Sequence, residues 1–280
     1  MDITHLRQWI GRKECQEDIV TPFPVAALAA TLDRHDPPPR DGDEIPHSAH
    51  WLYFLETAVA SELGHDGHPK RGGFLPPVEL PRRMWAGGRI DFRSPVCIGD
   101  RIRRESEVKS VEAKTGKSGA LVFVMVQHTL YAGDRVAIVE EHDIVYREAA
   151  KPGETAPPGK TAPTNAAWQR SVNMNEAALF RYSALIFNAH RIHYDIDYCR
   201  EVEGYPGLIV HGPLQTTLLL DLCRRHDPRP LRRLDYRATQ PVFHQENFGV
   251  CGQPAPDGAT AELWTATAAG QYAMRATASF

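Results

Sequence analysis

Alternating apolar and polar residues predict a set of β-strands in each half of the chain. Residues 104–111 (RESEVKSV) and 124–131 (VMVQHTLY) have the period of two that is typical of a strand with one covered face. In the first half we expect strands at residues 88–92, 100–111, 120–132 and 135–146. In the second half we expect strands at residues 232–243, 247–251, 260–269 and 272–279.

Each set of strands follows a segment with helical character. Residues 50–58 (HWLYFLETA) have helical apolar spacing. Residues 213–222 (PLQTTLLLDL) form the second expected helix, because Pro213 suits a first helical position. Apolar segments at residues 23–32 and 177–187 precede these helices. The repeated order indicates an internal duplication and an α+β fold in which each antiparallel sheet wraps a central helix.

A change of composition separates the two halves. Residues 149–164 (AAKPGETAPPGKTAPT) are rich in Pro, Gly, Ala and Thr and contain no large apolar side chain. Such a segment is typical of a linker. We therefore expect an N-terminal domain at residues 1–148 and a C-terminal domain at residues 165–280.

Composition and charge argue against several classes of protein. The 280 residues carry a formal net charge of −3, so no overall field attracts the chain to nucleic acid or to an anionic membrane surface. The sequence has no apolar run of about 18 residues to span a membrane, and its start lacks the pattern of a secretory signal. The five cysteines are widely spaced without a Cys-x-x-Cys pair, which favours free thiols in a reducing compartment. We expect a cytoplasmic protein.

The candidate chemistry lies in two motifs of the second half. Asn188, His190 and His193 lie within six residues, and His211 precedes Gly212 at the start of the expected helix. A histidine can take a proton from water, and backbone N–H groups at a helix N-terminus can hold a carbonyl oxygen that gains charge. Together these groups are sufficient to add water to a conjugated thioester without a metal.

These motifs resemble those of the MaoC-like family of R-specific enoyl-CoA hydratases, which has the hot-dog fold. The sequences FNAHRIHYD at residues 187–195 and YPGLIVHGP at residues 205–213 are more similar still to the fused double-hot-dog branch. That branch includes 3-hydroxyacyl-thioester dehydratases and mesaconyl-C4-CoA and itaconyl-CoA hydratases. Residues 72–87 (GGFLPPVELPRRMWAG) also resemble its N-terminal domain.

The resemblance implies two hot-dog domains side by side, with their sheets in one long antiparallel layer behind two central helices. It also implies that the N-terminal domain is degenerate and the C-terminal domain catalytic. The implied activity is reversible hydration of a 2-enoyl-CoA to a 3-hydroxyacyl-CoA, in a homodimer that needs no cofactor besides its acyl-CoA substrate. An acyl-CoA thioesterase and a non-catalytic acyl-thioester-binding subunit remain as alternatives, because both are compatible with this fold.

Position by position, the resemblance assigns roles to residues of the motifs. His193 matches the catalytic histidine, and Gly212 matches the glycine whose N–H binds the thioester carbonyl. Asn188 falls where the broader family has an aspartate, and it can orient water but cannot accept a proton. The second proton-handling group is therefore open. The candidates are Asp195, Tyr182 and His190.

Further residues are expected to bind the substrate. These residues are His211, Tyr182, His190, Arg191 and Arg237. CoA phosphates or a substrate carboxylate would meet arginines of residues 81–89, or the group Arg232, Arg233 and Arg237. In the first half, His47 and His50 lie near the position of the catalytic histidine, but no matching motif accompanies them.

Simpler interpretations exist for the same residues. Asn188 can be a turn residue, His190 a structural hydrogen-bonding residue, and Gly212 the entry to a helix. The spacing of His190, His193 and His211 is not that of a helical zinc site, so no metal is expected.

Overall fold

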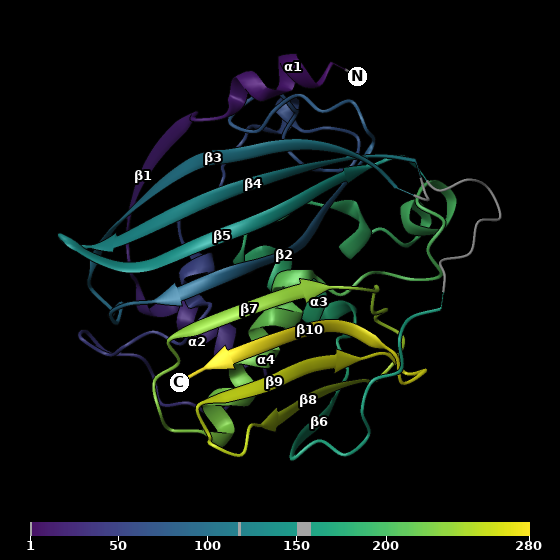
Figure 1. Cartoon of the computed structure of the whole chain (residues 1–280). Helices are drawn as coiled ribbons and strands as arrows, with labels where there is room; N and C mark the ends of the chain where they lie inside the picture. The colour runs from purple at the N-terminus through teal and green to yellow at the C-terminus, as the bar shows by residue number, and fades with distance from the viewer. Residues whose placement is uncertain (1, 117–118, 150–157) are drawn as a thin grey trace.

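The structure, a computed structural model, describes residues 2–116, 119–149 and 158–280. The strands of its first half are β1 (Lys13–Ile19), β2 (Arg82–Phe92), β3 (Arg101–Gly116), β4 (Gly119–Ala132) and β5 (Arg135–Arg147). Those of the second half are β6 (Trp168–Val172), β7 (Arg233–Ala238), β8 (Phe248–Pro254), β9 (Thr260–Ala266) and β10 (Tyr272–Ser279). All of them belong to one curved antiparallel sheet (Figure 1).

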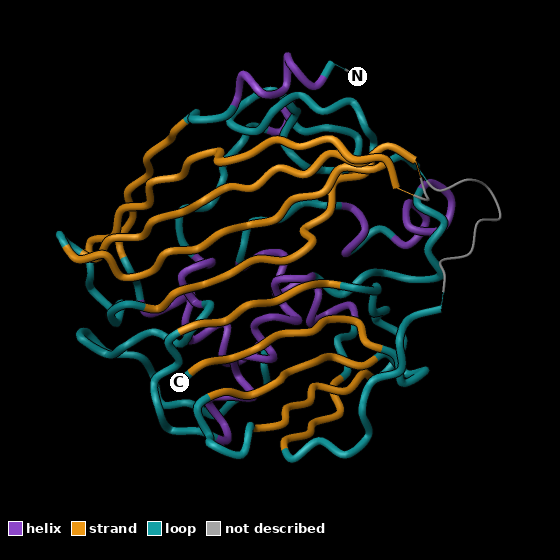
Figure 2. The backbone as a smooth tube through the Cα atoms, viewed as in Figure 1, coloured by secondary structure: helices purple, strands orange, loops and turns teal. Residues whose placement is uncertain are grey.

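The order of the strands in this sheet is a palindrome, β1-β3-β4-β5-β2-β7-β10-β9-β8-β6. Read inward from the two ends, β1 corresponds to β6, β3 to β8, β4 to β9 and β5 to β10, until β2 meets β7 at the centre (Figure 2). The halves join there through antiparallel pairs from Gly87↔Arg237 to Asp91↔Arg233. An approximate twofold axis therefore relates the halves, which confirms the expected duplication and the double hot-dog arrangement.

Two glycines make this central junction possible. A Cβ atom on Gly87 would lie 2.4 Å from the carbonyl oxygen of Tyr236 on β7, and one on Gly88 would lie 2.4 Å from the hydroxyl of the same tyrosine. Strand β2 begins at Arg82, earlier than the expected start at residue 88, and a bulge between Trp85 and Gly87 interrupts its register. The bulge interrupts the alternation of side chains along β2, so the sequence pattern does not show the period of two at the start of this strand.

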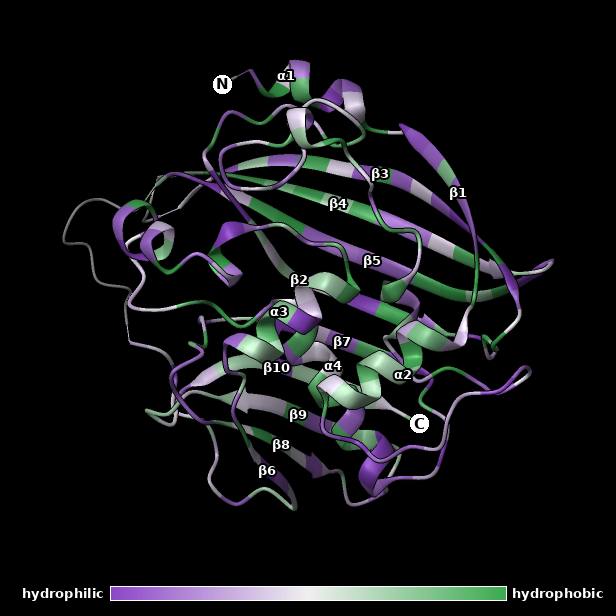
Figure 3. Ribbon diagram, turned by 180° about the vertical axis from the view of Figure 1, so that it is seen from behind, coloured by the Kyte–Doolittle hydropathy of each residue, from purple (hydrophilic) through white to green (hydrophobic). Residues whose placement is uncertain are grey.

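Three helices lie on one face of the sheet, as Figure 3 shows: α2 (Pro22–Thr31), α3 (Glu176–Leu185) and α4 (Gly212–His226). Helix α4 is the central one, and every residue from Leu214 to Cys223 is buried. Helices α2 and α3 pack against each other beside it. The short elements are α1 (Ile3–Leu6), η1 (Arg7–Trp9), η2 (Ala49–Leu52), η3 (Ala60–Glu62), η4 (Arg191–His193) and the π-helical turn η5 (Tyr198–Val202).

The helix expected at residues 50–58 is wrong. Only the single turn η2 forms there, and it is bounded by left-handed backbone at Ser48 (φ 74°) and Phe54 (φ 57°). Leu52, Tyr53 and Phe54 are buried in succession, which a helix with one buried face does not allow. Helix α2 forms in the apolar segment at residues 23–32 instead, and the described residues of the first half contain no helix equivalent to the central α4.

The expected linker at residues 149–164 falls partly outside the described residues, because 150–157 are not among them. In its described part, Thr161 forms a β-bridge with Gln271, and Ala162 packs against Cys251 and Trp264. Within the described ranges, no helix combines the length and the apolar character that crossing a membrane requires.

Candidate active site

His193 lies in the turn η4 and is buried. Its Nδ1 is 2.7 Å from the carbonyl oxygen of Ile209. Because a carbonyl oxygen only accepts hydrogen bonds, Nδ1 must carry the ring proton, and the lone pair of the neutral ring is on Nε2. The fold therefore fixes the tautomer that a general base needs.

His211 supports the His193 ring from one side. The two rings are stacked, with centroids 3.5 Å apart and planes 18° apart. His211 is fully buried, its Nε2 is 2.8 Å from Ser183 Oγ, and the edge of the Tyr182 ring packs on it. Tyr182 is itself in the core, where burial raises the pKa of its hydroxyl well above the usual range. Within this geometry, Tyr182 and His211 hold the position of His193.

Gly212 begins α4 immediately after His211. Its N–H has no acceptor among the residues that the structure describes. A Cβ atom at this position would lie 3.2 Å from Cε3 of Trp85, so the indole of β2 covers the glycine closely. A free N–H at the positive end of a long helix suits a carbonyl oxygen that acquires negative charge.

Burial keeps the imidazoles of the site neutral near pH 7. It lowers the pKa of His193 to about 4, although the bond to Ile209 partly opposes the shift. It lowers the pKa of His190 to about 2 and that of His211 well below the usual range. A neutral imidazole can accept a proton from water, so these histidines are in the protonation state that a base requires.

Asn188 shapes the turn that carries these histidines. Its side-chain Oδ1 accepts a hydrogen bond from the backbone N–H of His190 at 3.0 Å, and its own N–H donates to the Ser183 carbonyl oxygen at 2.8 Å. The turn follows Phe187, whose φ is 48°. The Asn188 amide NH2 has no partner in the described part of the chain, so it can still donate to a ligand.

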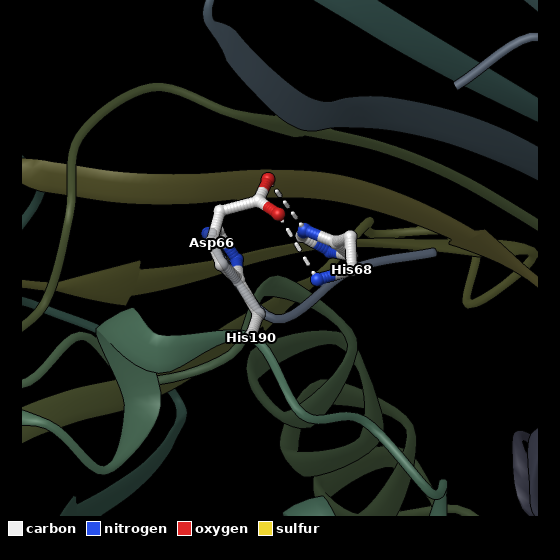
Figure 4. Close-up of side chains that lie close together, drawn as sticks. All are labelled: Asp66, His68 and His190. Carbon is white, nitrogen blue, oxygen red and sulfur yellow. Dashed lines mark hydrogen bonds and ion pairs between the residues drawn. The ribbon is translucent and has the colours of Figure 1, made fainter. Parts of the chain in front are cut away.

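The structure adds Asp66 and His68, which sequence reasoning missed. Figure 4 shows them beside His190, and one ligand atom from each of the three residues lies within 4.8 Å of the others. Asp66 Oδ1 accepts from the His68 N–H at 3.0 Å, and Asp66 Oδ2 is 3.2 Å from His68 Nδ1. The sequence DGH in a Gly- and Pro-rich stretch carries no motif, and only the tertiary fold brings it to the site.

The loop of residues 64–68 docks tightly on the histidine motif. The Arg191 N–H donates to the Asp66 carbonyl oxygen at 2.9 Å, and Arg191 Nη1 donates to the His65 carbonyl oxygen at 3.1 Å. Gly67 has a φ of +87°, and a Cβ atom there would be 1.9 Å from the Ala189 carbonyl oxygen. The N-terminal half is therefore part of the site that the motif predicted in the C-terminal half.

Four imidazoles from both halves form a row. The ring centroids of His68 and His190 are 4.0 Å apart, those of His190 and His193 are 5.5 Å apart, and His211 follows at 3.5 Å. Asp66, His68 and His190 also have the donor types of a divalent-metal site. The expectation of no metal considered only histidines of the second half, so it did not test this set.

The arginines expected to bind substrate separate into three environments. Arg191 is committed to Asp195, at 3.0 and 2.7 Å, and to the docked loop. Arg237 is exposed on β7 next to Tyr236, whose ring packs inward on Trp85; side chains alternate along a strand, so Arg237 points to the outer face of the sheet. Arg83 of β2 lies close enough to His68 and His190 to lower the pKa of both.

The remaining arginines of the two expected groups are elsewhere or engaged. Arg82 pairs with Glu203, and Arg89 with Glu141 and Asp143. Arg233 pairs with Asp91 and Asp235. Arg232 lines a separate cavity of about 220 Å³ together with His47 and His50. The structure therefore brings Arg83, but not the group at residues 232–237, to the histidine row.

Fold and site together define a double hot-dog protein of the MaoC-like dehydratase class. A MaoC-like dehydratase from Phytophthora capsici with a known crystal structure aligns with a TM-score of 0.73 and 11% identity, over 100% of this chain and 98% of its own, and shows the same fold. Residues 48–244 match the family described as hydroxyacyl-thioester dehydratase type 2.

Two relatives support the same class. The mesaconyl-C(4)-CoA hydratase of Chloroflexus aurantiacus is 43% identical over 263 residues, which cover 90% of this chain and 94% of the relative. The mitochondrial hydroxyacyl-thioester dehydratase type 2 of Schizosaccharomyces pombe is 27% identical over 273 residues, covering 86% and 90%. The chain belongs to the hydroxyacyl-thioester dehydratase type 2 family and is a hydratase/dehydratase.

Proposed function

We propose that this enzyme adds water to a 2-enoyl-CoA at the His193 site, and that mesaconyl-C4-CoA is its substrate. The observation that carries the proposal is the fixed Nε2 lone pair of His193, whose ring stacks on His211, the residue immediately before the free N–H of Gly212 at the start of α4. The identity to the Chloroflexus aurantiacus hydratase supports the choice of substrate.

The residues divide the reaction between them. As the water oxygen bonds to C3, the water proton passes to His193 Nε2. The electron pair of the C2–C3 double bond moves towards the thioester, whose oxygen is held by the Gly212 N–H. The proton then reaches C2, and the free amide of Asn188 orients the water. These steps need no cofactor, because one water supplies both groups that are added.

Arg83 is our choice for the anionic part of the substrate. A C4-CoA thioester of mesaconate carries a free carboxylate, and the CoA moiety carries phosphates. Arg83 lies near His68 and His190, whereas its neighbour Arg82 is already paired with Glu203 at 3.0 Å. A guanidinium binds either anion through paired hydrogen bonds.

A panel of thioesters tests the function. Purified enzyme is mixed with crotonyl-CoA, mesaconyl-C4-CoA, itaconyl-CoA and a long-chain enoyl-CoA, and the loss of enoyl-thioester absorbance is followed together with free thiol. We expect the fastest loss with mesaconyl-C4-CoA and no thiol release. Thiol release without loss of the double bond would identify a thioesterase, and binding without any turnover would identify an acyl-thioester-binding subunit.

We also propose that the enzyme is a cytoplasmic homodimer that does not bind nucleic acid. The net charge of −3 and the five free cysteines support the location and the lack of nucleic-acid binding. Exposed Phe23 and Phe180, on the mutually packed helices α2 and α3, support a self-association surface. Light scattering of the purified protein measures the oligomeric state, and a monomer at micromolar concentration would contradict the dimer.

A further inference from the structure

Among the residues that the structure describes, no carboxylate is in contact with the His193 ring. The contacts that the structure gives this ring are the Ile209 carbonyl oxygen and the rings of His190 and His211, which are all neutral. When His193 takes a proton from water, a positive charge appears in a buried place. A buried charge without a counter-charge is unfavourable, so the site needs a carboxylate that Asn188 does not supply.

The candidates named from the sequence do not meet this need. The Asp195 carboxylate is bound by Arg191 at 2.7 Å and by the Tyr198 N–H at 2.9 Å, so its charge is already balanced. Tyr182 is buried in the core behind His211. His190 is part of the row itself and carries no negative charge.

We propose that Asp66 of the N-terminal half, acting through His68, is the acidic partner of this site. The two residues stabilise the proton that the histidine row takes from water. This inference rests on the proposed hydration. The Asp66 carboxylate holds His68 by its Nδ1–H. The rings of His68 and His190 lie between that carboxylate and His193, with centroids 4.0 Å apart from His68 to His190 and 5.5 Å apart from His190 to His193. Both are positioning residues, since they act through the row of rings.

The chemical balance of hydration is unchanged by this assignment. The O–C3 bond forms while the water proton moves to His193 Nε2, and the enolate oxygen is held by Gly212. The same proton is then given to C2, and the C2–H bond completes the addition of one water. Asp66 remains ionised throughout and takes no proton, so no other reactant is needed.

The surrounding charges make the carboxylate more important. Arg83 and Arg71 act on His68 and disfavour a positive charge there, and Arg71 is held by the carbonyl oxygens of Val78, Leu80 and Pro81. Burial alone would raise the pKa of Asp66, but the hydrogen bonds from His68 outweigh it and keep the carboxyl ionised. Asp66 is therefore an ionised carboxylate beside neutral imidazoles and near the positive charges of Arg71 and Arg83.

The hydrogen bonds favour a charge partner over a metal site. Both Asp66 oxygens are occupied by His68, one by its backbone N–H and one by its ring. The rings of His68 and His190 are in contact, with centroids 4.0 Å apart and planes tilted by 44°. A metal would instead require the nitrogen and oxygen atoms to face a common centre.

Four variants and one control test the proposal with mesaconyl-C4-CoA. Asp66→Asn keeps the acceptor for the His68 N–H but removes the charge, and His68→Gln removes the ring. We expect each to lower kcat roughly 10- to 100-fold with little change in KM, and the double variant to be no worse than His68→Gln. Asp66→Glu should recover part of the rate. Glu62→Gln, an exposed carboxylate beside the same loop, should match the wild type.

A measurement without substrate separates this proposal from the hydratase assignment. Nitrogen NMR of the imidazoles should show His68 protonated on Nδ1 in the wild type, and its signals should titrate at lower pH in Asp66→Asn. Full kcat in Asp66→Asn, alongside an inactive His193→Ala, would overturn the inference and leave the hydratase standing. An unchanged His68 titration would overturn it too. Loss of activity with EDTA and its return with Zn²⁺ would make the cluster a metal site instead. A wild type inactive on every thioester would remove the proposed function itself.

Discussion

One hydrogen bond decides what His193 can do. The Ile209 carbonyl oxygen accepts from Nδ1 at 2.7 Å, so the proton-accepting nitrogen is Nε2. Stacking on His211 prevents the ring from turning, because His211 is itself held by Ser183 and Tyr182. The residue is therefore pre-oriented before any substrate arrives, which is how a general base gains efficiency.

Replacing this base should abolish most of the activity. We expect His193→Ala to lower kcat/KM for enoyl-CoA hydration by at least roughly 100-fold, the usual contribution of a general acid–base group. His47→Ala is the matched control, since burial lowers the pKa of His47 to about 4 as well, yet it lies in the first half. The control should stay within about threefold of the wild type, as a residue without a chemical role does. Equal losses in the two variants would point to destabilisation rather than chemistry.

The same environment predicts the pH dependence. The active form of His193 is neutral, and burial lowers its pKa from 6.5 to about 4. Activity should therefore stay level as the pH falls from 7 towards 5 and should decline only near pH 4. The profile of kcat/KM reports the free enzyme and is the measurement to make. An acid limb near pH 6.5 would show that a solvated histidine is the base.

At the scale of elements, the N-terminus of α4 and strand β2 meet at Gly212. Gly212→Ala would place a methyl group 3.2 Å from the Trp85 ring, so either the indole or the first turn must shift. We expect hydration to slow by roughly 100-fold, as when one oxyanion donor is lost, while the melting temperature changes little. Gly73→Ala, where no atom lies within 4 Å, is the control and should retain the wild-type rate.

The sequence predicted elements best where a single period governs them. Strands β3 to β5 are found close to the expected positions, because apolar and polar side chains alternate along much of their length. The helix at residues 213–222 is found for another reason, since Pro213 marks its start. The apolar spacing of residues 50–58 wrongly predicted a helix. Three consecutive buried side chains there belong to an irregular turn. Local periodicity cannot reveal such a segment, since tertiary contacts alone decide its backbone.

The candidate site also contains residues that a local sequence pattern reveals and residues that it does not. The histidine motif and Gly212 were visible because they are contiguous in sequence. Asp66 and His68 were not, since they come from a loop more than a hundred residues earlier, whose only cue is DGH. Arg237 was placed in the site by its neighbours in sequence, but strand alternation turns it outward. Residues that tertiary contacts bring to a site have no local sequence pattern that identifies them.

At the scale of the whole molecule, the two halves carry related turns whose histidines have different hydrogen-bond partners. His50 lies in η2 and His193 in η4, each three residues after another histidine (His47 and His190), and these segments follow the mutually packed helices α2 and α3. In the first half, however, His50 Nε2 is 3.0 Å from Glu140, which is buried and also bonded to Trp51 and His142. The Nε2 of the first-half histidine is therefore bound to a buried carboxylate, whereas the Nε2 of His193 has no partner among the described residues.

The join between the halves depends on a second buried carboxylate. Asp221 on α4 is almost wholly buried and accepts from Arg34 of the first half at 2.6 Å, from Arg170 at 2.9 Å and from Arg225 at 2.7 Å. Removing its charge takes this carboxylate from Arg170 and Arg225 and leaves Arg34 with Asp36 as its partner. Breaking a buried ion pair from one side costs about 3–5 kcal/mol, because the remaining charge is unpaired.

Asp221→Asn should therefore lower the free energy of unfolding by about 3–5 kcal/mol in urea denaturation. Asp235→Asn removes a carboxylate that pairs with Arg233 at the surface, and its effect should be within about 1 kcal/mol. Since Arg34 ties the first half to α4, Asp221→Asn should also lower the midpoint at which both halves unfold. Asp221 lies about two helical turns from Gly212, so the turnover of the folded variant should be preserved. A variant as stable as the Asp235→Asn control would show that the halves are held together by the β2–β7 junction and the apolar core instead.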